Sequence, residues 1–556
     1  MIELLVVIVA GLSVIAGATV VGPRLGVASP LVLVAIGVGA SFLPVFGAAR
    51  IEPEWILEGV LPPLLYSAAV SMPAMNFRRE FGAISGLSVL LVVGSALVLG
   101  LFFVAVIPDL GFAWGVALGA IVSPTDAVAT SIVKQTPVSQ RVVAILDGES
   151  LLNDATALVL LRTAIVATAA SFSFWGAVGT FSYSVAVALV IGGVTGWLNL
   201  VVRRRVTDST VNTVISFTVP FVAAVPTGLL GASGLVAAVV AGLVTGIRAP
   251  RDLSPQNRLS DAQNWRTVEL VLEGAVFLTM GLQIKTIVTN VEDDRAGVWA
   301  AVLVAAGALV LTLLLRAAYV APLLRVLAAR SRRGARMQSH VQDIQDRMNT
   351  PEGKQETLDR LRTRRKSASE RELERFARRI TRGLANIEYF LREPLGWREG
   401  TAVVWAGMRG AVTVAAAQTL PEDTPQRPTL VLVAFAVAVL SLLVQGGTLG
   451  PVLRHTAPPA DQATRDEQTT EERARIFDLL KTSAETIPAL ARPDGEPIRE
   501  YFTEAKSYRL AVIAAQRSAL LDARDNGTFD ADVLAGALVN LDAAQITLEM
   551  RGRFAE

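Results

Sequence analysis

The sequence predicts an all-α polytopic membrane protein with about 13 transmembrane helices and a helical cytoplasmic tail. Of its 556 residues, 52% are hydrophobic and only 18% are charged, which is more apolar surface than a soluble chain of this length needs to bury. Apolar segments close to the roughly 20 residues of a membrane span recur along most of the chain. Lys and Arg gather in alternate loops between these segments, as in membrane proteins of fixed orientation.

Composition also excludes several classes of protein. The chain has no Cys, which excludes disulfides, thiolate metal sites and cysteine nucleophiles, and its 2 His exclude a histidine-rich zinc site. The 51 Lys and Arg nearly balance the 49 Asp and Glu, and a net charge of +2 gives no reason to expect nucleic acid as a partner. No cofactor is predicted.

The predicted spans follow one another from the start of the chain to about residue 453. The first begins at Met1 without a basic leader or a convincing cleavage site, so we interpret it as an uncleaved span. In chain order the spans are 2–21, 29–47, 54–72, 83–107, 110–133, 141–166, 174–202, 209–226, 229–247, 266–288, 297–328, 399–420 and 428–453. We therefore expect a transmembrane domain over residues 1–453 and a cytoplasmic domain over residues 454–556.

The short loops between the spans alternate in charge. One set carries 12 Lys and Arg, and the other carries 3, namely Arg50, Arg295 and Arg427. Because cytoplasmic loops hold the excess of Lys and Arg, the alternation predicts an outside N-terminus and a cytoplasmic C-terminus. The Ala- and Val-rich composition favours the plasma (inner) membrane of a prokaryote, with membrane lipids as neighbours.

Two long hydrophilic segments then fall on the cytoplasmic side. Residues 329–395 carry 17 Lys and Arg against 10 Asp and Glu, a net charge of +7, and include a helix-like run from Glu370 to Arg382. Residues 455–556 carry 12 against 18, a net charge of −6, with helical spacing and a break at Asn526 and Gly527. These opposite charges allow two interpretations. In one, the acidic tail docks on the basic loop; in the other, the two segments are solvated and do not interact.

The fifth span is predicted to be broken at Ser123-Pro124-Thr125-Asp126. Pro124 removes a backbone donor and obstructs the preceding turn. The break exposes carbonyls of one half-helix and N–H groups of the other, and Asp126 can offset the positive end of the second half. A simple proline kink is the alternative, but a kink requires no acidic residue beside it.

The sixth span opens with four polar side chains within about one and a half turns. Ser150 and Asp154 share a helix face, and Glu149 and Asn153 form a second pair beside it. Hard cations prefer clustered oxygen ligands of these kinds. Two carboxylates in one apolar helix cost roughly 2.5 to 3.5 kcal/mol each on insertion scales, which disfavours a purely structural role.

The twelfth span carries Arg409 between two glycines that weaken the helix. An interruption seven spans after the first, and so of opposite orientation, is what inverted-topology repeats give. Arg409 can compensate half-helix C-terminal carbonyls there. Arg316 in the eleventh span also needs an anion, and we expect Glu149 to supply it, because Asp154 must stay free to exchange ligands.

Four segments in this order resemble the signature segments of the sodium/proton exchangers of the cation:proton antiporter superfamily, in its bacterial and animal-exchanger branch. They are residues 123–126, 148–154, 407–412 and 443–448. The resemblance covers residues 1 to about 453, and the tail resembles bacterial tails less specifically. It implies a homodimer in which a dimerisation domain flanks a mobile six-helix core.

The resemblance also implies roles for individual residues of the sixth span. Asp154 would bind the cation or a proton, and Ser150 and Thr125 would add oxygen ligands for Na+. Asn153 would be the partner of Asp154 in an Asn-Asp pair.

In the other spans, the resemblance implies that the fifth and twelfth cross at their unwound centres. Asp126 and Arg409 would lie at this crossing, and Glu149 and Arg316 would form a buried structural ion pair.

The sequence departs from the family pattern at two positions. Relatives often carry an acidic residue where Ser67 follows Pro62-Pro63-Leu64-Leu65-Tyr66, and Glu273 stands where many relatives look uncharged. Glu273 either supplies a compensating carboxylate or pairs with a nearby arginine such as Arg266.

A single exchangeable carboxylate predicts antiport of one Na+ or Li+ for one H+, because either ion neutralises Asp154 in a low-dielectric cavity. Asn153 cannot titrate, so the exchange is expected to be electroneutral, and its cellular role would be pH regulation.

Potassium/proton exchange by the same mechanism is the alternative. A cation channel would need rings of ligands that the sequence lacks. An intramembrane hydrolase using Asp126 and Asp154 would lack His and Cys for nucleophile activation, so we expect no catalytic residue.

Overall fold

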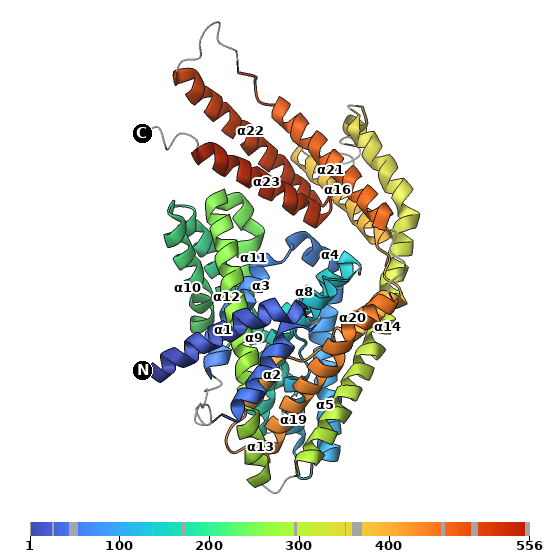
Figure 1. Cartoon of the computed structure of the whole chain (residues 1–556). Coiled ribbons are helices and arrows are strands. Elements are labelled where there is room, and N and C mark those ends of the chain that lie inside the picture. Colours follow the sequence, from blue (N-terminus) through green and yellow to red (C-terminus); the bar gives the residue numbers. More distant parts are fainter. Residues whose placement is uncertain are drawn as a thin grey trace. The chain divides into compact units, whose positions relative to one another are not determined.

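A computed structural model of the chain is entirely helical over the residues that it describes (Figure 1). These are residues 2–24, 27–43, 54–136, 138–169, 174–293, 297–350, 352–357, 370–456, 462–490 and 499–550. Arg50, Arg295, residues 44–47 of the second predicted span and residues 358–369 of the basic segment lie outside them. The chain divides into two compact units, the first formed by residues 1–253, 259–324 and 397–458 and the second by residues 254–258, 325–396 and 459–556.

The first unit contains helices at every predicted span. They are α1 (Ile2–Arg24), α2 (Ser29–Ser41), α3 (Leu61–Ser71), α4 (Ala74–Ser85), α5 (Val92–Val106), α6 (Phe112–Val122), α7 (Val128–Val133), α8 (Gln140–Ala169), α9 (Phe174–Arg203), α10 (Ser209–Leu229), α11 (Gly234–Asp252), α12 (Pro255–Leu282), α13 (Ile284–Asp293), α14 (Val298–Asn349), α17 (Trp397–Trp405), α18 (Ala411–Gln418), α19 (Arg427–Ser441) and α20 (Gly447–Thr456). π-helical turns at Trp55–Val60, Gly86–Leu91 and Leu442–Gly446 precede α3, α5 and α20.

Ten helices of the described chain are long and apolar enough to cross a membrane, and three shorter ones are also apolar. The predicted span at 399–420 is not among them, because it is divided into α17 and α18. One of the ten, α23 (Ala531–Met550), lies in the second unit instead, where it packs against two helices of the tail.

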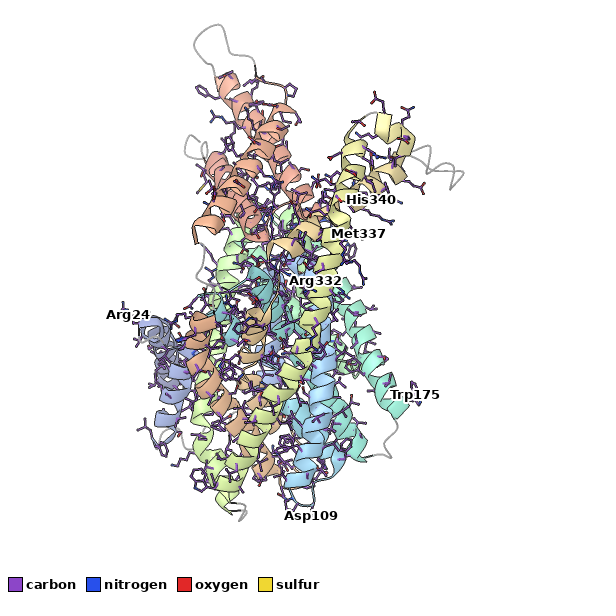
Figure 2. The ribbon with its side chains drawn as sticks, turned by 90° about the vertical axis from the view of Figure 1, so that its right-hand side faces the viewer. Arg24, Asp109, Trp175, Arg332, Met337 and His340 are labelled. Carbon is purple, nitrogen blue, oxygen red and sulfur yellow. The ribbon has the colours of Figure 1, made fainter. Side chains whose placement is uncertain are left out.

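Two helices extend well beyond their predicted ends. α12 begins at Pro255 rather than near 266, with the proline at a first helical position that its fixed φ favours. α14 continues to Asn349 instead of ending near 328, and Figure 2 shows Arg332, Met337 and His340 following one another along it. Hydropathy marks where an apolar face ends, whereas a helix continues through polar residues that form helices readily.

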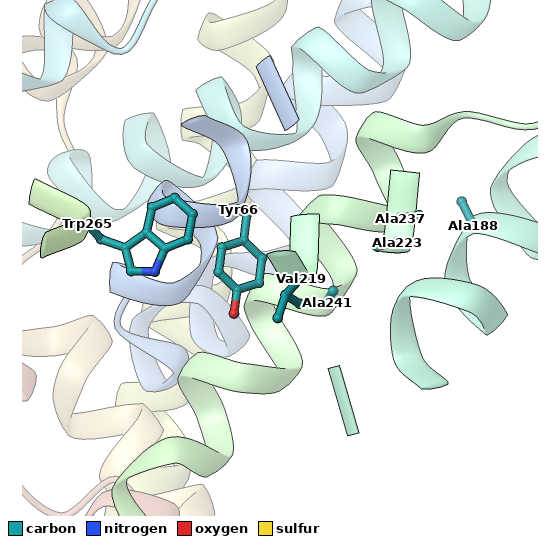
Figure 3. Close-up of a cluster of buried hydrophobic side chains, with 7 residues drawn as sticks. All are labelled: Tyr66, Ala188, Val219, Ala223, Ala237, Ala241 and Trp265. Carbon is teal, nitrogen blue, oxygen red and sulfur yellow. The ribbon is translucent and has the colours of Figure 1, made fainter. Parts of the chain in front are cut away.

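Small residues allow the helices of the first unit to approach closely. α11 packs against α9 and α3, and a Cβ added at Gly192 of α9 would lie 2.4 Å from the carbonyl oxygen of Ala237. Figure 3 shows Tyr66 and Trp265 beside alanines of these helices, with the two ring centroids 5.1 Å apart. Small residues at helix contacts are typical of membrane proteins, where close backbone approach replaces the hydrophobic effect.

Two of the 12 Lys and Arg of the predicted cytoplasmic loops, Arg141 and Arg203, are buried in the structure. Arg141 pairs with Glu80 of α4 at 2.6 Å, and Arg203 pairs with Asp261 of α12 at 3.0 Å. The arginine side chains are 2% and 0% exposed. The count of loop cations therefore includes two arginines that form buried ion pairs between helices, because the sequence alone does not distinguish a solvated arginine from a paired one.

Exposed tryptophans begin several of the predicted spans. Trp55, Trp175 and Trp299 are 71%, 78% and 78% exposed, and each begins a span expected to start outside. Figure 2 shows Trp175 pointing away from the ribbon at the start of α9. Trp397, which is 68% exposed, begins α17 at the opposite expected face. Such residues are enriched at both membrane interfaces, where one edge is apolar and the other is hydrated.

The second unit includes the distal part of α14 and the helices α16 (Glu370–Arg392), α21 (Gln462–Glu485), α22 (Arg499–Asn526) and α23. Ile476, Leu520 and Leu541 form its apolar core. The predicted break between α22 and α23 is present, with Gly527 at φ +74°, a conformation that glycine adopts without strain. Arg392 of the basic segment pairs with Glu472 of the tail at 3.4 Å.

Candidate functional site

Two helices of the first unit are interrupted, and their interruptions touch. α6 ends at Val122 and α7 begins at Val128, while α17 ends at Trp405 and α18 begins at Ala411. The backbone N–H of Asp126 donates to the carbonyl of Met408 at 2.7 Å. Both predicted interruptions are therefore present, and together they form one region of non-helical backbone.

The Asp126 carboxylate compensates the N-termini of two half-helices. Its Oδ1 accepts a hydrogen bond of 2.9 Å from the N–H of Val128, at the start of α7. The N–H of Ala411, at the start of α18, also donates to this carboxylate. Both helix ends carry a partial positive charge, so one carboxylate stabilises both.

Arg409 compensates the opposite helix ends. Its Nε donates to the carbonyl of Val122 at 3.0 Å and its Nη1 to the carbonyl of Gly407. The side chain is 2% exposed. A helix C-terminus carries a partial negative charge and carbonyl groups without a hydrogen-bond donor. The buried Arg409 side chain supplies both a positive charge and donors to these carbonyls.

Ser441 and Gln445 hold the same region from α19 and the π-helical turn that follows it. The Ser441 hydroxyl accepts from the N–H of Arg409 at 2.8 Å and donates to the Gln445 amide oxygen at 2.8 Å. Gln445 in turn donates to the carbonyl of Trp405 at 3.0 Å. Sequence reasoning noted the segment 443–448 as a motif but gave these two residues no role. Each is 0% exposed, and a buried polar pair in an apolar span is the signal that could have found them.

Glu149 and Arg316 form a bidentate ion pair. Nη2 of Arg316 lies 2.7 Å from Oε2 of Glu149, and Nη1 contacts Oε1. Nε of Arg316 also donates to the carbonyl of Val403 at 2.8 Å, so the pair joins α8, α14 and α17. The two residues are 1% and 2% exposed.

Thr125 and Asn153 complete the polar layer beside this ion pair. The Thr125 hydroxyl donates to Oε1 of Glu149 at 3.3 Å and accepts from Nδ2 of Asn153 at 2.5 Å. Asn153 is 0% exposed, and its Oδ1 has no hydrogen-bond partner among the described residues. Asn153, which precedes Asp154 in the expected Asn-Asp pair, is thus directed at Thr125.

A cavity of about 110 Å³ lies beside the two interruptions, and we call it the Asp154 cavity. The Asp154 side chain is 8% exposed and has no hydrogen bond or ion pair with the described residues. The other polar residues in the lining are Thr125, Asp126, Ser150, Glu269, Glu273 and Thr413. No Lys, Arg or His is part of this lining. The cavity therefore presents oxygen ligands and negative charge without a compensating cation.

The remaining candidates occupy different positions. Ser150 lines the Asp154 cavity, and its hydroxyl donates to the carbonyl of Asp147 at 3.1 Å. Ser67 is not part of the lining; its hydroxyl donates to Oε2 of Glu269 at 3.3 Å. Glu273 lines the cavity, and the structure gives it no ion pair with Arg266 over the described residues. Glu269 was missed from the sequence, although it stands one helical turn before Glu273 in α12.

Gly410 is required by the closeness of the two interruptions. A Cβ added at this position would lie 1.3 Å from Oδ2 of Asp126, which no side chain can tolerate. We expect Gly410→Ala to lower the stability of the purified protein by about 1 to 3 kcal/mol, the usual cost of overpacking. Thermal unfolding in detergent measures this loss.

Gly94 provides the matched control for that substitution, because nothing lies within 4 Å of a Cβ added there. Gly94→Ala should leave stability unchanged or raise it by up to about 1 kcal/mol, because Gly94 lies within α5 and alanine favours a helix over glycine. Equal unfolding temperatures for the two variants would contradict the contact between Gly410 and Asp126.

The chain resembles known proteins over most of its length. A family model described as "Sodium/hydrogen exchanger, transmembrane" matches residues 9–455. The chain is 26% identical to an uncharacterized Na+/H+ exchanger of Mycobacterium bovis, over 98% of this chain and 96% of that protein. It is 24% identical to a Na+/H+ antiporter of Aphanothece halophytica, over 78% of this chain and 71% of that protein. The structure of a sodium/proton antiporter of Methanocaldococcus jannaschii matches with a TM-score of 0.54 and 14% identity, over 81% of this chain and 99% of that one.

Proposed function

Because the chain belongs to the sodium/hydrogen exchanger family, and so is a multi-pass membrane transporter and not an enzyme, we propose that it exchanges Na+ for H+ by competition of the two ions at Asp154. One observation carries the assignment of the site. The buried Asp154 carboxylate has no partner among the described residues and lines a cavity that holds no Lys, Arg or His. A buried charge without a partner is costly, so this group favours whichever small cation neutralises it.

Competition of Na+ and H+ for one carboxylate explains why the fluxes of the two ions are coupled. Loaded with either a proton or Na+, Asp154 is neutral, and only the empty carboxylate carries a net charge across the low-dielectric interior. The empty carrier therefore resists crossing, and each ion returns only in exchange for the other. Alternating access of the Asp154 cavity to the two sides completes the cycle.

A stoichiometry of one Na+ for one H+ is supported by three neighbours of Asp154. Asn153 cannot titrate, and the Asp126 carboxylate is already bonded by backbone N–H groups of α7 and α18. Glu149 is paired with Arg316. With Asp154 as the group that changes its ion in transit, each cycle moves no net charge.

The same proposal includes the architecture implied by the resemblance. We take the chain to have 13 spans, with its N-terminus outside and its C-terminus in the cytoplasm of a cell whose plasma membrane holds a homodimer. α6–α7 and α17–α18 would be counterparts in inverted repeats. Their contact through Asp126 and Met408 supports this assignment, because paired broken helices of opposite orientation mark the binding sites of such carriers.

Sodium-driven proton flux in proteoliposomes tests the function. With an imposed pH gradient, we expect Na+ and Li+ to release protons at rates that are the same with the membrane potential clamped or free. A rate that follows the potential would contradict one-for-one exchange. Protein-free liposomes under the same gradient provide the control for leak.

Potassium/proton exchange remains the second candidate, because side-chain oxygens alone do not fix the size of the bound ion. A proton flux driven by K+ and not by Na+ would keep Asp154 as the site and change the transported ion. Flux driven by none of the three cations would overturn the proposed function.

A further inference from the structure

α12 places a pair of carboxylates in the transport region that the proposed mechanism does not use. Glu269 and Glu273 are four residues apart and both line the Asp154 cavity, so they share the helix face that looks into it. With Asp126 and Asp154 they bring four carboxylates into one lining that includes no Lys, Arg or His.

The hydrogen bonds of these four carboxylates separate them into two kinds. Asp126 accepts from backbone N–H groups, and Glu269 accepts from the Ser67 hydroxyl. Asp154 and Glu273 have no hydrogen bond or ion pair with the described residues, and the Asp154 side chain is only 8% exposed. Two groups of the cavity are therefore free to bind an exchangeable cation or proton.

A second cavity, of about 490 Å³, adjoins the first, and we call it the wide cavity. Glu273 and Phe277 are the two residues common to both linings. Glu273 is the acidic residue of the wide cavity, and Arg454 is its basic one. Glu273 therefore stands where the wide cavity meets the Asp154 cavity, with Phe277 as the apolar part of the same wall.

The wide cavity lies at the ends of helices that lead into the basic loops. Its lining includes Ser29 at the start of α2, Gln135 and Thr136 after α7, and Arg454 near the end of α20. The cations of the predicted cytoplasmic loops, such as Arg24 and Lys134, flank these same segments. An ion that came from that side through the wide cavity would pass Glu273, which is common to both linings.

We propose that Glu273 is a second ion-binding carboxylate of the exchanger, which receives a monovalent alkali cation from the wide cavity and transfers it to Asp154. This inference rests on the proposed exchange function. In the transfer, Na+ moves from Glu273 to Asp154, and the proton that Asp154 held moves to Glu273 and then to water of the wide cavity. The exchange of Na+ and H+ between the two carboxylates leaves both of them neutral. Glu273 becomes charged again when it gives its proton to water, as it was before it bound Na+, so one Na+ is taken up for one H+ released and no net charge is added to the cycle.

Kinetics of Glu273→Gln in proteoliposomes test the proposal. We expect the KM for Na+ to rise about tenfold, the effect of losing a contact of about 1.4 kcal/mol, while the maximal rate stays within about threefold. Glu273→Asp keeps the carboxylate and should return KM to within about threefold of the wild-type value. An unchanged KM in Glu273→Gln, or an equal defect in the Asp variant, would overturn the inference.

Glu58→Gln provides the matched control, because Glu58 belongs to the segment leading into α3 but to neither cavity lining. This variant should keep both KM and the maximal rate. A wild-type protein without cation-driven proton flux would end the proposed function itself. Normal wild-type flux with an unaltered Glu273→Gln variant would end only the role of Glu273.

A chemical measurement tests the access route without relying on transport rates. The chain has no Cys, so Ser131→Cys creates a single thiol in the lining of the wide cavity. We expect a membrane-impermeant thiol reagent to modify it, Na+ to slow the reaction, and Glu273→Gln to remove this effect of Na+. Absence of modification, or equal slowing by Na+ in both backgrounds, would contradict the route through Glu273.

Discussion

Replacing Asp154 with Asn should reduce sodium-driven proton flux to that of protein-free liposomes. Asn has nearly the same shape but cannot bind a proton, and its amide oxygen offers Na+ a partial charge instead of a full one. Among the residues that the structure describes, Asp154 has no partner that the substitution would leave unpaired, so the protein should still fold. Proton flux at several Na+ concentrations, together with the elution profile in detergent, checks both expectations.

Asp147→Asn is the control on the same helix. Asp147 pairs with Lys134 at 3.0 Å, but the two side chains are 27% and 54% exposed. An exposed pair of this kind contributes about 0 to 1 kcal/mol, so transport and folding should be nearly unchanged. Full activity of Asp154→Asn would exclude Asp154 as the exchanging carboxylate, and with it the proposed mechanism.

Arg316→Met should be the most destabilising of the substitutions considered. It leaves the Glu149 carboxylate buried without its cation and also removes the donor to the Val403 carbonyl. Breaking one side of a buried ion pair costs about 3 to 5 kcal/mol. Thermal unfolding of the detergent-solubilised protein should show a large decrease in the unfolding temperature, and the yield of folded protein should decrease with it.

Two further variants make this measurement specific. Arg325→Met removes an exposed arginine of the same helix and should cost no more than roughly 0.5 kcal/mol. Glu149→Gln combined with Arg316→Met removes both charges, and it should recover much of the loss because no bare charge stays buried. If the double variant is as unstable as the sum of the single ones, the two residues do not act as a pair.

The interruptions of α6–α7 and α17–α18 could be predicted from the sequence because their causes are local. Pro124 cannot donate a backbone hydrogen bond, and the glycines beside Arg409 weaken a helix wherever it packs. The pairing of Glu149 with Arg316 was also within reach, since an arginine in an apolar span needs an anion. Few carboxylates are available there.

The direction of individual side chains could not be predicted, because it depends on how each helix is rotated against its neighbours. Asn153 is adjacent to Asp154 in sequence, yet it points to Thr125. Glu269 lies at the site because α12 and α3 are packed so that the Ser67 hydroxyl donates to its carboxylate. The span containing Glu269 was predicted to begin at 266, and the sequence analysis gave this residue no role.

The volume of the Asp154 cavity sets a condition on any ion that enters it. Its space of about 110 Å³ is several times the roughly 10 to 15 Å³ that one water molecule needs, so the cavity admits an alkali ion together with part of its water. In the proposed mechanism, the oxygens of Asp154, Ser150 and Thr125 replace the rest of the water shell. Choice among Li+, Na+ and K+ then depends on the cost of dehydration set against the contacts that each ion regains, rather than on charge, which all three share.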